Sequence, residues 1–476
     1  MIHKSRVSAM YDFKQPIEWD KQLIERYDLA GPRYTSYPTA PQFHEAFSQS
    51  SLFRAIVRSN LAHRPLSLYF HIPFCESLCY YCGCNKIVTH NKARALPYIQ
   101  RMIQELSLYA DLFEPGKQVQ QLHWGGGTPT FISDEEMSLL MNASRRLFNF
   151  ADDESGDFSI EIHPGQVSAD TMNHLRQLGF NRVSMGVQDF DENVQQAVNR
   201  FNTYEQVSSL TNALRQQQYR SISMDLIYGL PLQSQQSLQN TLHRVVDLGP
   251  DRLSIFNYAH MPHLFKSQRL IRDEDLPSPS EKLDMLQSAI EFLQSAGYVY
   301  IGMDHFARPE DPLAKAQQQG KLQRNFQGYS THGNCDLLAL GVSSISMIDN
   351  VYVQNAKDLN SYQQKMDMGL LPIAKGFTLN QEDLLRRFLI NQLICHFDLE
   401  FKDIERQFDV DPQSHFRHEL EQLQPMVKDG LLEINSRGIK VFNKGCLLIR
   451  RICMVFDEYL NQKKSTVSPI RYSKII

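Results

Sequence analysis

The chain has 476 residues, of which 42% are hydrophobic and 21% are charged, a composition typical of a globular protein with more than one domain. Its 49 Lys and Arg residues nearly balance 53 Asp and Glu residues, and the net charge of −4 argues against a nucleic-acid-binding protein. The first residues lack the apolar core of a secretory signal, and no apolar run is long enough to span a membrane. We therefore expect a cytoplasmic protein whose cysteine thiols stay reduced.

Residues 1–52 show little helical or strand periodicity and are predicted to form an N-terminal arm. Within it, Gly31–Ala40 has the sequence G-P-R-Y-T-S-Y-P-T-A, which alternates prolines with aromatic residues. Because proline fixes the backbone angle φ and aromatic side chains pack well, we expect an extended segment that docks on the rest of the protein. A plain surface strap is the alternative.

Four of the eight cysteines lie between Cys75 and Cys84, on a loop that follows a predicted strand. Cys75, Cys79 and Cys82 have the spacing C-x3-C-x2-C. Three thiolates on a short loop can bind three irons of a [4Fe–4S] cluster and leave the fourth iron open for a small molecule. A zinc site usually needs a second cysteine pair, which is missing here, and a disulfide suits small secreted domains. We predict a cluster with these three ligands and without Cys84.

From 53 to 375, strand-like segments alternate with amphipathic helical segments such as Ala169–Leu178 and Glu281–Ser295. The predicted strands are Ser67–Ile72, Gln120–Trp124, Phe158–Ile162, Arg182–Val187, Ser221–Ile227, Arg252–Asn257 and Tyr298–Met303. This alternation predicts an α/β fold with a parallel sheet, in which functional residues gather at the carboxyl ends of the strands. The cysteine loop and the glycines 125–127 lie at or near such ends.

The glycine run in H-W-G-G-G-T-P-T exposes backbone that a ligand can approach closely. No G-K-S/T motif follows, so it is not a phosphate-binding P-loop, and a plain turn is the alternative. Gln188 and Asp225 could be helix caps, and Arg200 could be an exposed surface charge. Together with Glu161, however, these residues recur near successive strand ends, which favours one common site.

The composition changes near residue 376, and a mostly helical domain is predicted from there to residue 476. Helices are expected at Leu379–His396, Asp398–Phe408 and Gln413–Lys428, then a hairpin of Leu431–Ile434 and Gly438–Phe442, a helix at Leu447–Leu460 and a loose tail from Ser465. Three helices and a hairpin suggest a winged helix. Such units often bind DNA, but this segment is charge-mixed, and we favour a lid over an open barrel.

The cysteine loop also carries a family resemblance. The string H-I-P-F-C…C-Y-Y-C-G-C-N-K, with Tyr81 before the last predicted ligand, resembles the radical S-adenosylmethionine (SAM) enzymes and, more narrowly, the oxygen-independent coproporphyrinogen III oxidases. The similarity extends from Gly31 to the region of Cys453. It implies a partial (β/α)6 TIM-like barrel for 53–375, open on one side, with the N-terminal arm near the substrate entrance.

The resemblance further implies a [4Fe–4S] cluster and two SAM molecules per chain. The residues at matching positions for SAM are Tyr69, Tyr81, Gly126, Gly127, Thr128, Glu161, Gln188, Arg200, Asp225 and Ala259, with Phe326, Gln327 and Ile345 around the second SAM. Arg33 and Tyr34 are predicted to contact the substrate, with Arg33 as a partner for one of its carboxylates.

The implied reaction is the oxidative decarboxylation of two propionates of coproporphyrinogen III to vinyl groups, which gives protoporphyrinogen IX for haem biosynthesis. A 5′-deoxyadenosyl radical made from SAM at the cluster would remove hydrogen, and an electron donor and a final acceptor are required. A monomer is expected. The alternative is a haem chaperone or a haem-modifying radical SAM protein. His163 and Gly165 mildly favour this alternative, because the oxidase pattern has Asp and Arg at these positions. Cys84 and the arm Pro32–Ala40 favour the oxidase.

Overall fold

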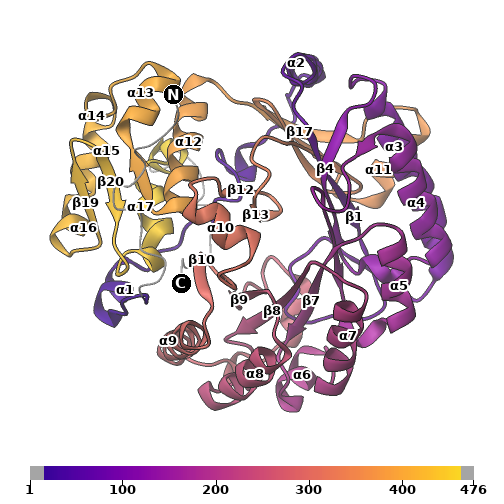
Figure 1. Cartoon of the computed structure of the whole chain (residues 1–476), viewed down its shortest axis with the longest axis horizontal. Helices are drawn as coiled ribbons and strands as arrows, with labels where there is room; N and C mark the ends of the chain where they lie inside the picture. Colours follow the sequence, from indigo (N-terminus) through magenta and orange to yellow (C-terminus); the bar gives the residue numbers. More distant parts are fainter. Residues whose placement is uncertain (1–15, 463–476) are drawn as a thin grey trace. The chain divides into compact units, whose positions relative to one another are not determined.

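The computed structural model describes residues 16–462, which form two compact units (Figure 1). The barrel unit consists of residues 42–285 and 334–378. The C-terminal unit consists of residues 16–41, 286–333 and 379–462. The segment 286–333, which was placed in the barrel domain from the sequence, therefore packs with the C-terminal segment instead. Among the described residues, none of the helices combines the length and the apolar character needed to cross a membrane.

The barrel unit is built on a sheet in which six neighbouring strands run parallel to one another. In spatial order these strands are β9 (Arg252–Asn257), β8 (Ser221–Tyr228), β7 (Arg182–Gln188), β6 (Asp157–Ile162), β4 (Gln118–Gly126) and β1 (Leu66–Ile72). β14 (Asp336–Leu340) adds a further parallel strand beside β1, and β15 (Ile345–Ile348), β16 (Val351–Asn355) and β17 (Ile373–Thr378) continue the sheet antiparallel. The predicted partial parallel barrel is confirmed.

Helices connect these strands and lie along the outer side of the sheet (Figure 1). They are α2 (Gln49–Leu61), α3 (Ala95–Ala110), α4 (Asp134–Leu147), α5 (Ala169–Gln177), α6 (Glu192–Val198), α7 (Tyr204–Gln216), α8 (Gln235–Leu248) and α11 (Leu359–Asp367). Three short strands accompany them: β2 (Phe74–Cys75), β3 (Ile87–Val88) and β5 (Asn149–Phe150). Several helices begin at a Ser or Thr whose side chain accepts a backbone N–H, for example α4 at Ser133 and α7 at Thr203.

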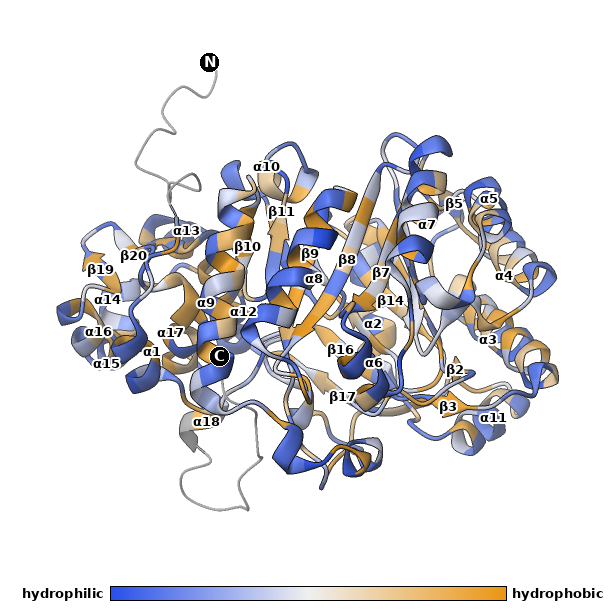
Figure 2. Cartoon of the chain, turned by 90° about the horizontal axis from the view of Figure 1, so that it is seen from below, coloured by the Kyte–Doolittle hydropathy of each residue, from blue (hydrophilic) through white to orange (hydrophobic). Residues whose placement is uncertain are grey.

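Side chains alternate between the two faces of each parallel strand, as the pleat of a strand requires. Figure 2 shows this alternation of hydrophobic and hydrophilic residues along β8. On the outer face, Trp124 is fully buried and meets the ring of Phe180 edge-on, with 5.0 Å between the ring centres. Burial of one such large apolar side chain stabilises the fold by roughly 1.5–3 kcal/mol. The inner face instead carries polar residues, which are therefore held at fixed positions by a rigid sheet.

The C-terminal unit contains a winged-helix-like arrangement. Its helices are α12 (Gln381–His396), α13 (Phe401–Phe408), α14 (Pro412–His415), α15 (Arg417–Gln422) and α16 (Gln424–Lys428), and its three-stranded sheet has the order β18 (Asp398–Glu400), β20 (Gly438–Val441), β19 (Leu432–Asn435). The predicted hairpin is present. Two details differ from expectation: Asp398–Glu400 is a strand rather than the start of a helix, and the third predicted helix is divided into three pieces.

The remaining elements of this unit are α1 (Lys21–Tyr27), most of α9 (Pro279–Ser295), α10 (Pro312–Gln318), α17 (Ile449–Val455), α18 (Glu458–Gln462) and two hairpins, β10 (Val299–Gly302) with β11 (His305–Ala307) and β12 (Gln323–Asn325) with β13 (Gly328–Ser330). The predicted strand Tyr298–Met303 is thus one arm of an antiparallel hairpin, because the two residues after β10 leave no room for a crossover helix. The predicted final helix breaks between α17 and α18, and the predicted loose tail from Ser465 lies outside the described residues.

Candidate active site

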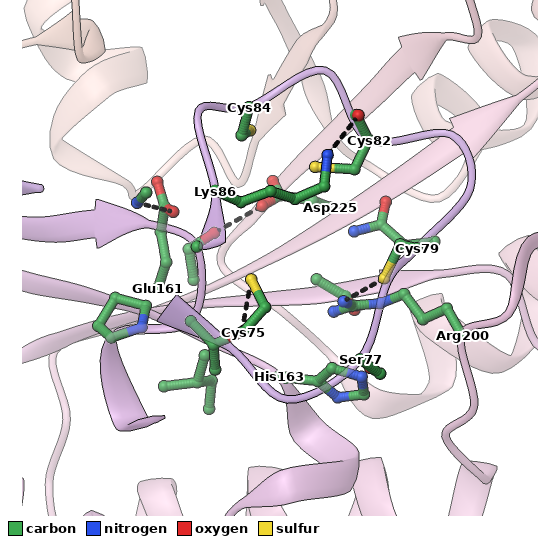
Figure 3. Close-up of a pocket in the computed structure, with 18 of the residues that line it drawn as sticks. Cys75, Ser77, Cys79, Cys82, Cys84, Lys86, Glu161, His163, Arg200 and Asp225 are labelled. Carbon is green, nitrogen blue, oxygen red and sulfur yellow. Dashed lines mark hydrogen bonds between the residues drawn. The ribbon is translucent and has the colours of Figure 1, made fainter. Parts of the chain in front are cut away.

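The cysteine loop leaves the end of β1 and is closed by a short parallel pairing of β2 with β3. Cys75, Cys79 and Cys82 line one cavity of about 170 Å³, and the loop carries them to the carboxyl end of the sheet (Figure 3). Cys84 lines the same cavity but is exposed, and all of these cysteines are free thiols. The three cysteines of the C-x3-C-x2-C motif therefore lie around the same cavity.

Hydrogen bonds from distant side chains fix the backbone of this loop. The Asn199 side chain donates to the carbonyl of Leu78 at 2.9 Å. Gln268, which is only 2% exposed, donates to the carbonyls of Tyr81 at 3.0 Å and Ala259 at 3.2 Å. A loop without regular secondary structure gains its shape from such bonds, because buried carbonyls must find donors. Neither Asn199 nor Gln268 is among the site residues predicted from the sequence.

The glycine turn after β4 packs directly against the cysteine loop. A Cβ atom at Gly127 would lie 2.6 Å from the carbonyl oxygen of Pro73, and Gly126 has a φ of +119°, which disfavours other residues. The next residue, Thr128, donates from its backbone N–H to the carbonyl of Phe74 at 2.8 Å and has its hydroxyl 3.7 Å from the sulfur of Cys75. The glycines therefore allow two loops to approach, in addition to any role in ligand binding.

A layer of polar side chains crosses the inner face of the sheet. Glu161 faces His123, whose Nε2 atom is 3.0 Å from Oε1 of the carboxylate, while Nδ1 of His123 is 2.6 Å from the hydroxyl of Ser159. The ring of Tyr69 stacks on His123 with 5.8 Å between the ring centres. Burial acts to raise the pKa of Glu161, but the contact with His123 and the N–H of Gly126 outweigh it, and the pKa is lowered. Glu161 is therefore held as a carboxylate.

Asp225 lies on the same layer two strands away. Its Oδ2 atom accepts a hydrogen bond of 2.9 Å from the hydroxyl of Ser184, and burial raises the pKa of Asp225 to about 6. Gln188 reaches the cavity because an irregularity in the β7–β8 register follows Gly186, and Gln188 itself has a φ of +68°. Within the described part of the chain, its buried Oε1 atom has no hydrogen-bond partner. A ligand donor would satisfy this atom.

Arg200 brings a positive charge to the opposite side of the cavity from Glu161 (Figure 3). Its Nε atom donates to the carbonyl of Gly186 at 3.1 Å, and Nη1 lies 3.7 Å from the sulfur of Cys79. The cavity thus joins four thiols, two carboxylates, the guanidinium of Arg200 and the ammonium of Lys86 within one small space. Such a set can hold a metal–sulfur group together with a zwitterionic ligand.

Comparisons with known proteins agree with a cavity that holds a metal–sulfur group and a zwitterionic ligand. The sequence profile of the Radical SAM superfamily matches residues 69–245, and that of the HemN C-terminal domain matches residues 379–448. The oxygen-independent coproporphyrinogen III oxidase of Pseudomonas aeruginosa is 51% identical over 97% of this chain and 99% of its own length. The Escherichia coli K12 protein of the same name is 51% identical over 94% of this chain and 97% of its own. The chain belongs to the oxygen-independent coproporphyrinogen III oxidase family.

The fold agrees over the same extent. The solved structure of coproporphyrinogen III oxidase (HemN) from Escherichia coli, described as a radical SAM enzyme, has a TM-score of 0.89 and 49% identity, and the match covers 94% of this chain and 100% of that chain. Membership in the radical SAM enzymes implies a [4Fe–4S] cluster and SAM as cofactors.

The residues of the cavity fit these cofactors. The three thiols of the C-x3-C-x2-C motif and Cys84 line one space together with Gln188, whose Oε1 atom is unsatisfied, and a carboxylate and a guanidinium stand on opposite sides of it. Among residues 16–462, no group of three or more His, Cys, Asp and Glu side chains converges on a point that could hold a single metal ion. A cluster does not require such convergence, because each of the three cysteines would bind a different iron.

The predicted SAM residues divide into three groups. Those that line the cavity are Tyr81, Gly126, Gly127, Thr128, Glu161, Gln188, Arg200 and Asp225. Tyr69, Ala259 and Ile345 also belong to the barrel unit but are not part of this lining. Phe326 and Gln327 lie at the turn between β12 and β13 of the C-terminal unit. Their roles as SAM ligands remain predictions.

The two predicted substrate residues differ in accessibility. The Arg33 side chain is 38% exposed and forms an ion pair of 3.1 Å with Asp304. Tyr34 is 4% exposed, and its hydroxyl donates to Asp457 at 2.9 Å. Arg33 can therefore reach a ligand, whereas the hydroxyl of Tyr34 is used inside the protein.

Proposed function

We propose that this chain catalyses the oxygen-independent oxidative decarboxylation of two propionates of coproporphyrinogen III, giving protoporphyrinogen IX. The observation that carries the proposal is the cavity itself: the three thiols of the C-x3-C-x2-C motif lie beside Glu161, Arg200 and Asp225 in a chain related over almost its full length to named oxidases. Each propionate loses carbon dioxide, one hydrogen atom and one electron to become a vinyl group.

The [4Fe–4S] cluster and SAM, when bound, supply the one-electron chemistry that removes hydrogen from an unactivated carbon. The protein supplies binding and orientation. Cys75, Cys79 and Cys82 would hold the cluster, and Gln268 and Asn199 keep the loop that carries them in shape.

The charged side chains that line the cavity are suited to the charged and polar groups of SAM. Arg200 would bind a carboxylate, and the carboxylate of Asp225 would accept donors from SAM. Glu161, kept ionised by its contact with His123, would offer negative charge on the other side.

The finer features of the proposal rest on the family resemblance. They are a second SAM near Phe326, Gln327 and Ile345, a cytoplasmic monomer, an external electron donor and a separate final electron acceptor. A substrate with four carboxylates needs cationic groups, and the exposed guanidinium of Arg33 is suited to one of them.

The test is anaerobic incubation of the cluster-loaded protein with SAM, a reductant and coproporphyrinogen III, followed by analysis of the products. Two vinyl groups per substrate are expected. Haem binding without any decarboxylation would instead favour a chaperone, and modification of haem would favour a haem-modifying enzyme.

A further inference from the structure

His163 is a cavity residue that the oxidase reading leaves without a function. It follows β6, lines the cavity with the cysteines and is buried (Figure 3). Figure 3 shows its ring beside Ser77, on the side of the cavity away from Glu161. The cationic side chain that faces it is Arg200, which adds electrostatic repulsion to any positive charge on the ring. His163 therefore belongs to the basic side of the cavity.

A backbone hydrogen bond determines which ring nitrogen of His163 carries the proton. The N–H of Gly165 donates to Nδ1 of His163 at 3.1 Å. Nδ1 is consequently an acceptor, and in the neutral ring the proton must be on Nε2. Burial, together with the charge of Arg200, lowers the pKa of His163 to about 3, so the neutral ring persists at physiological pH.

The Nε2 atom is then a donor that remains available for a ligand. The hydrogen bond between the His163 side chain and Gly165 uses Nδ1, and the residue lines the cavity. A neutral N–H beside a guanidinium favours an anion, because both groups donate and neither supplies competing negative charge. The anionic group that the proposed function brings to this cavity is the carboxylate of the methionine part of SAM.

We propose that His163 is a further SAM-binding residue, whose Nε2–H donates a hydrogen bond to the SAM carboxylate next to Arg200. This inference rests on the proposed function, because it takes SAM as the ligand of the cavity. Gly165 acts through His163, because the backbone N–H of Gly165 keeps the His163 proton on Nε2. A side chain at position 165 is excluded, because a Cβ there would lie 2.7 Å from the carbonyl oxygen of Phe201.

The decisive variant is His163→Asn. Its Oδ1 atom can accept the Gly165 N–H as Nδ1 does, so the local turn is kept, but no donor extends to the Nε2 position. His163→Gln is the complementary variant, because its amide N–H reaches farther and can restore part of the bond. His174→Asn is the matched control: this histidine lies on α5, and its Nε2 contacts Ser138 and the carbonyl of Asp134.

The measurement is equilibrium dialysis of the full-length, cluster-loaded protein under anaerobic conditions, with SAM and with decarboxylated SAM as probes. We expect His163→Asn to weaken SAM binding about 10- to 100-fold, as for a hydrogen bond to a charged group, with less loss in His163→Gln and none in His174→Asn. Decarboxylated SAM should bind the parent and His163→Asn equally.

Two results would overturn the inference: unchanged SAM affinity in His163→Asn at full iron content, or an equal loss for both probes. Turnover of coproporphyrinogen III by the parent protein is measured separately. If the parent decarboxylates its substrate and His163→Asn binds SAM normally, only the role of His163 fails. If SAM binding depends on His163 but no decarboxylation occurs, the proposed function fails instead.

Discussion

The hydroxyl of Tyr34 donates a hydrogen bond of 2.9 Å to Oδ2 of Asp457, and so ties the N-terminal arm to the segment between α17 and α18. Arg450 reinforces this attachment, because its guanidinium donates to the carbonyls of Gly31 at 2.8 Å and Pro32 at 3.0 Å. Arg33, which stands between these anchored residues in sequence, therefore occupies a fixed position on the C-terminal unit.

Replacing Tyr34 with Phe should loosen the arm. Asp457 is 2% exposed and would lose a donor, which costs about 1–3 kcal/mol for a buried polar group. Burial already raises the pKa of Asp457 and the Tyr34 hydroxyl opposes that rise, so Tyr34→Phe should raise the pKa further. Thermal unfolding and hydrogen exchange of residues 16–41 report the change. Tyr27→Phe is the matched control, since Tyr27 contacts the more exposed Asp429 and should have a smaller effect. Equal exchange in both variants would contradict the anchor.

Replacing Arg33 with Ala should impair the use of coproporphyrinogen III without weakening SAM binding. A lost hydrogen bond to a charged group predicts a decrease in kcat/KM of about 10- to 100-fold. Arg33→Lys should recover part of it, because lysine keeps the charge but not the two-pronged geometry. Steady-state assays with varied porphyrinogen provide the values. Arg26→Ala removes another arm arginine, one that pairs with Asp429, and should leave turnover unchanged. Turnover unaffected by Arg33→Ala would exclude Arg33 from the substrate site.

The parallel core was predictable because its strands carry β-branched and aromatic residues between clear turns. β14 escaped prediction since its sequence D-L-L-A-L consists mainly of residues that favour helices. β18 escaped because a strand of three residues has no measurable periodicity, and its pairing with β20 depends on tertiary contact.

The candidate site was predictable to the extent that its residues have a chemical signature. Cysteine spacing marked Cys75, Cys79 and Cys82, and the strand-end rule marked Asp225. Gln268 and Asn199 were not predictable, because their partners are backbone carbonyls of the cysteine loop, which leave no pattern in the sequence. The environment of His163 was also not predictable from the sequence, because the tautomer of its ring depends on a single backbone N–H.

Cys75→Ser should remove most of the iron and the visible absorbance of the reconstituted protein, whereas Cys84→Ser should retain both. The reason is that a cluster with an open iron needs three protein thiolates, and Cys84 is the exposed one of the four. Iron analysis with absorbance spectra is sufficient. Loss of iron in Cys84→Ser with retention in Cys75→Ser would reverse the ligand assignment.

SAM affinity should fall as the pH is lowered through the pKa of Asp225. Burial raises this pKa to about 6, so the group is ionised above pH 6 and becomes protonated below it. If the carboxylate accepts hydrogen bonds from SAM, ligand binding favours the ionised form, and affinity is highest above pH 6 and declines toward tenfold per pH unit below it. Equilibrium dialysis of the cluster-loaded protein between pH 5 and pH 8 measures the profile.

Asp225→Asn tests the origin of that profile. Its side chain is neutral throughout, so SAM should bind more weakly at pH 7.5 and with little pH dependence between 5 and 8. Glu161 supplies the internal comparison: because its pKa is lowered, it stays ionised across this window. Glu161→Gln should weaken binding yet keep a decline of affinity, moved to lower pH because the charge of Glu161 contributes to the raised pKa of Asp225. His123 faces the same layer of side chains and contacts Glu161. If the decline persisted in Asp225→Asn, the titrating group would have to be another member of that layer, and Asp225 would lose its assignment as the pH-sensitive ligand of SAM.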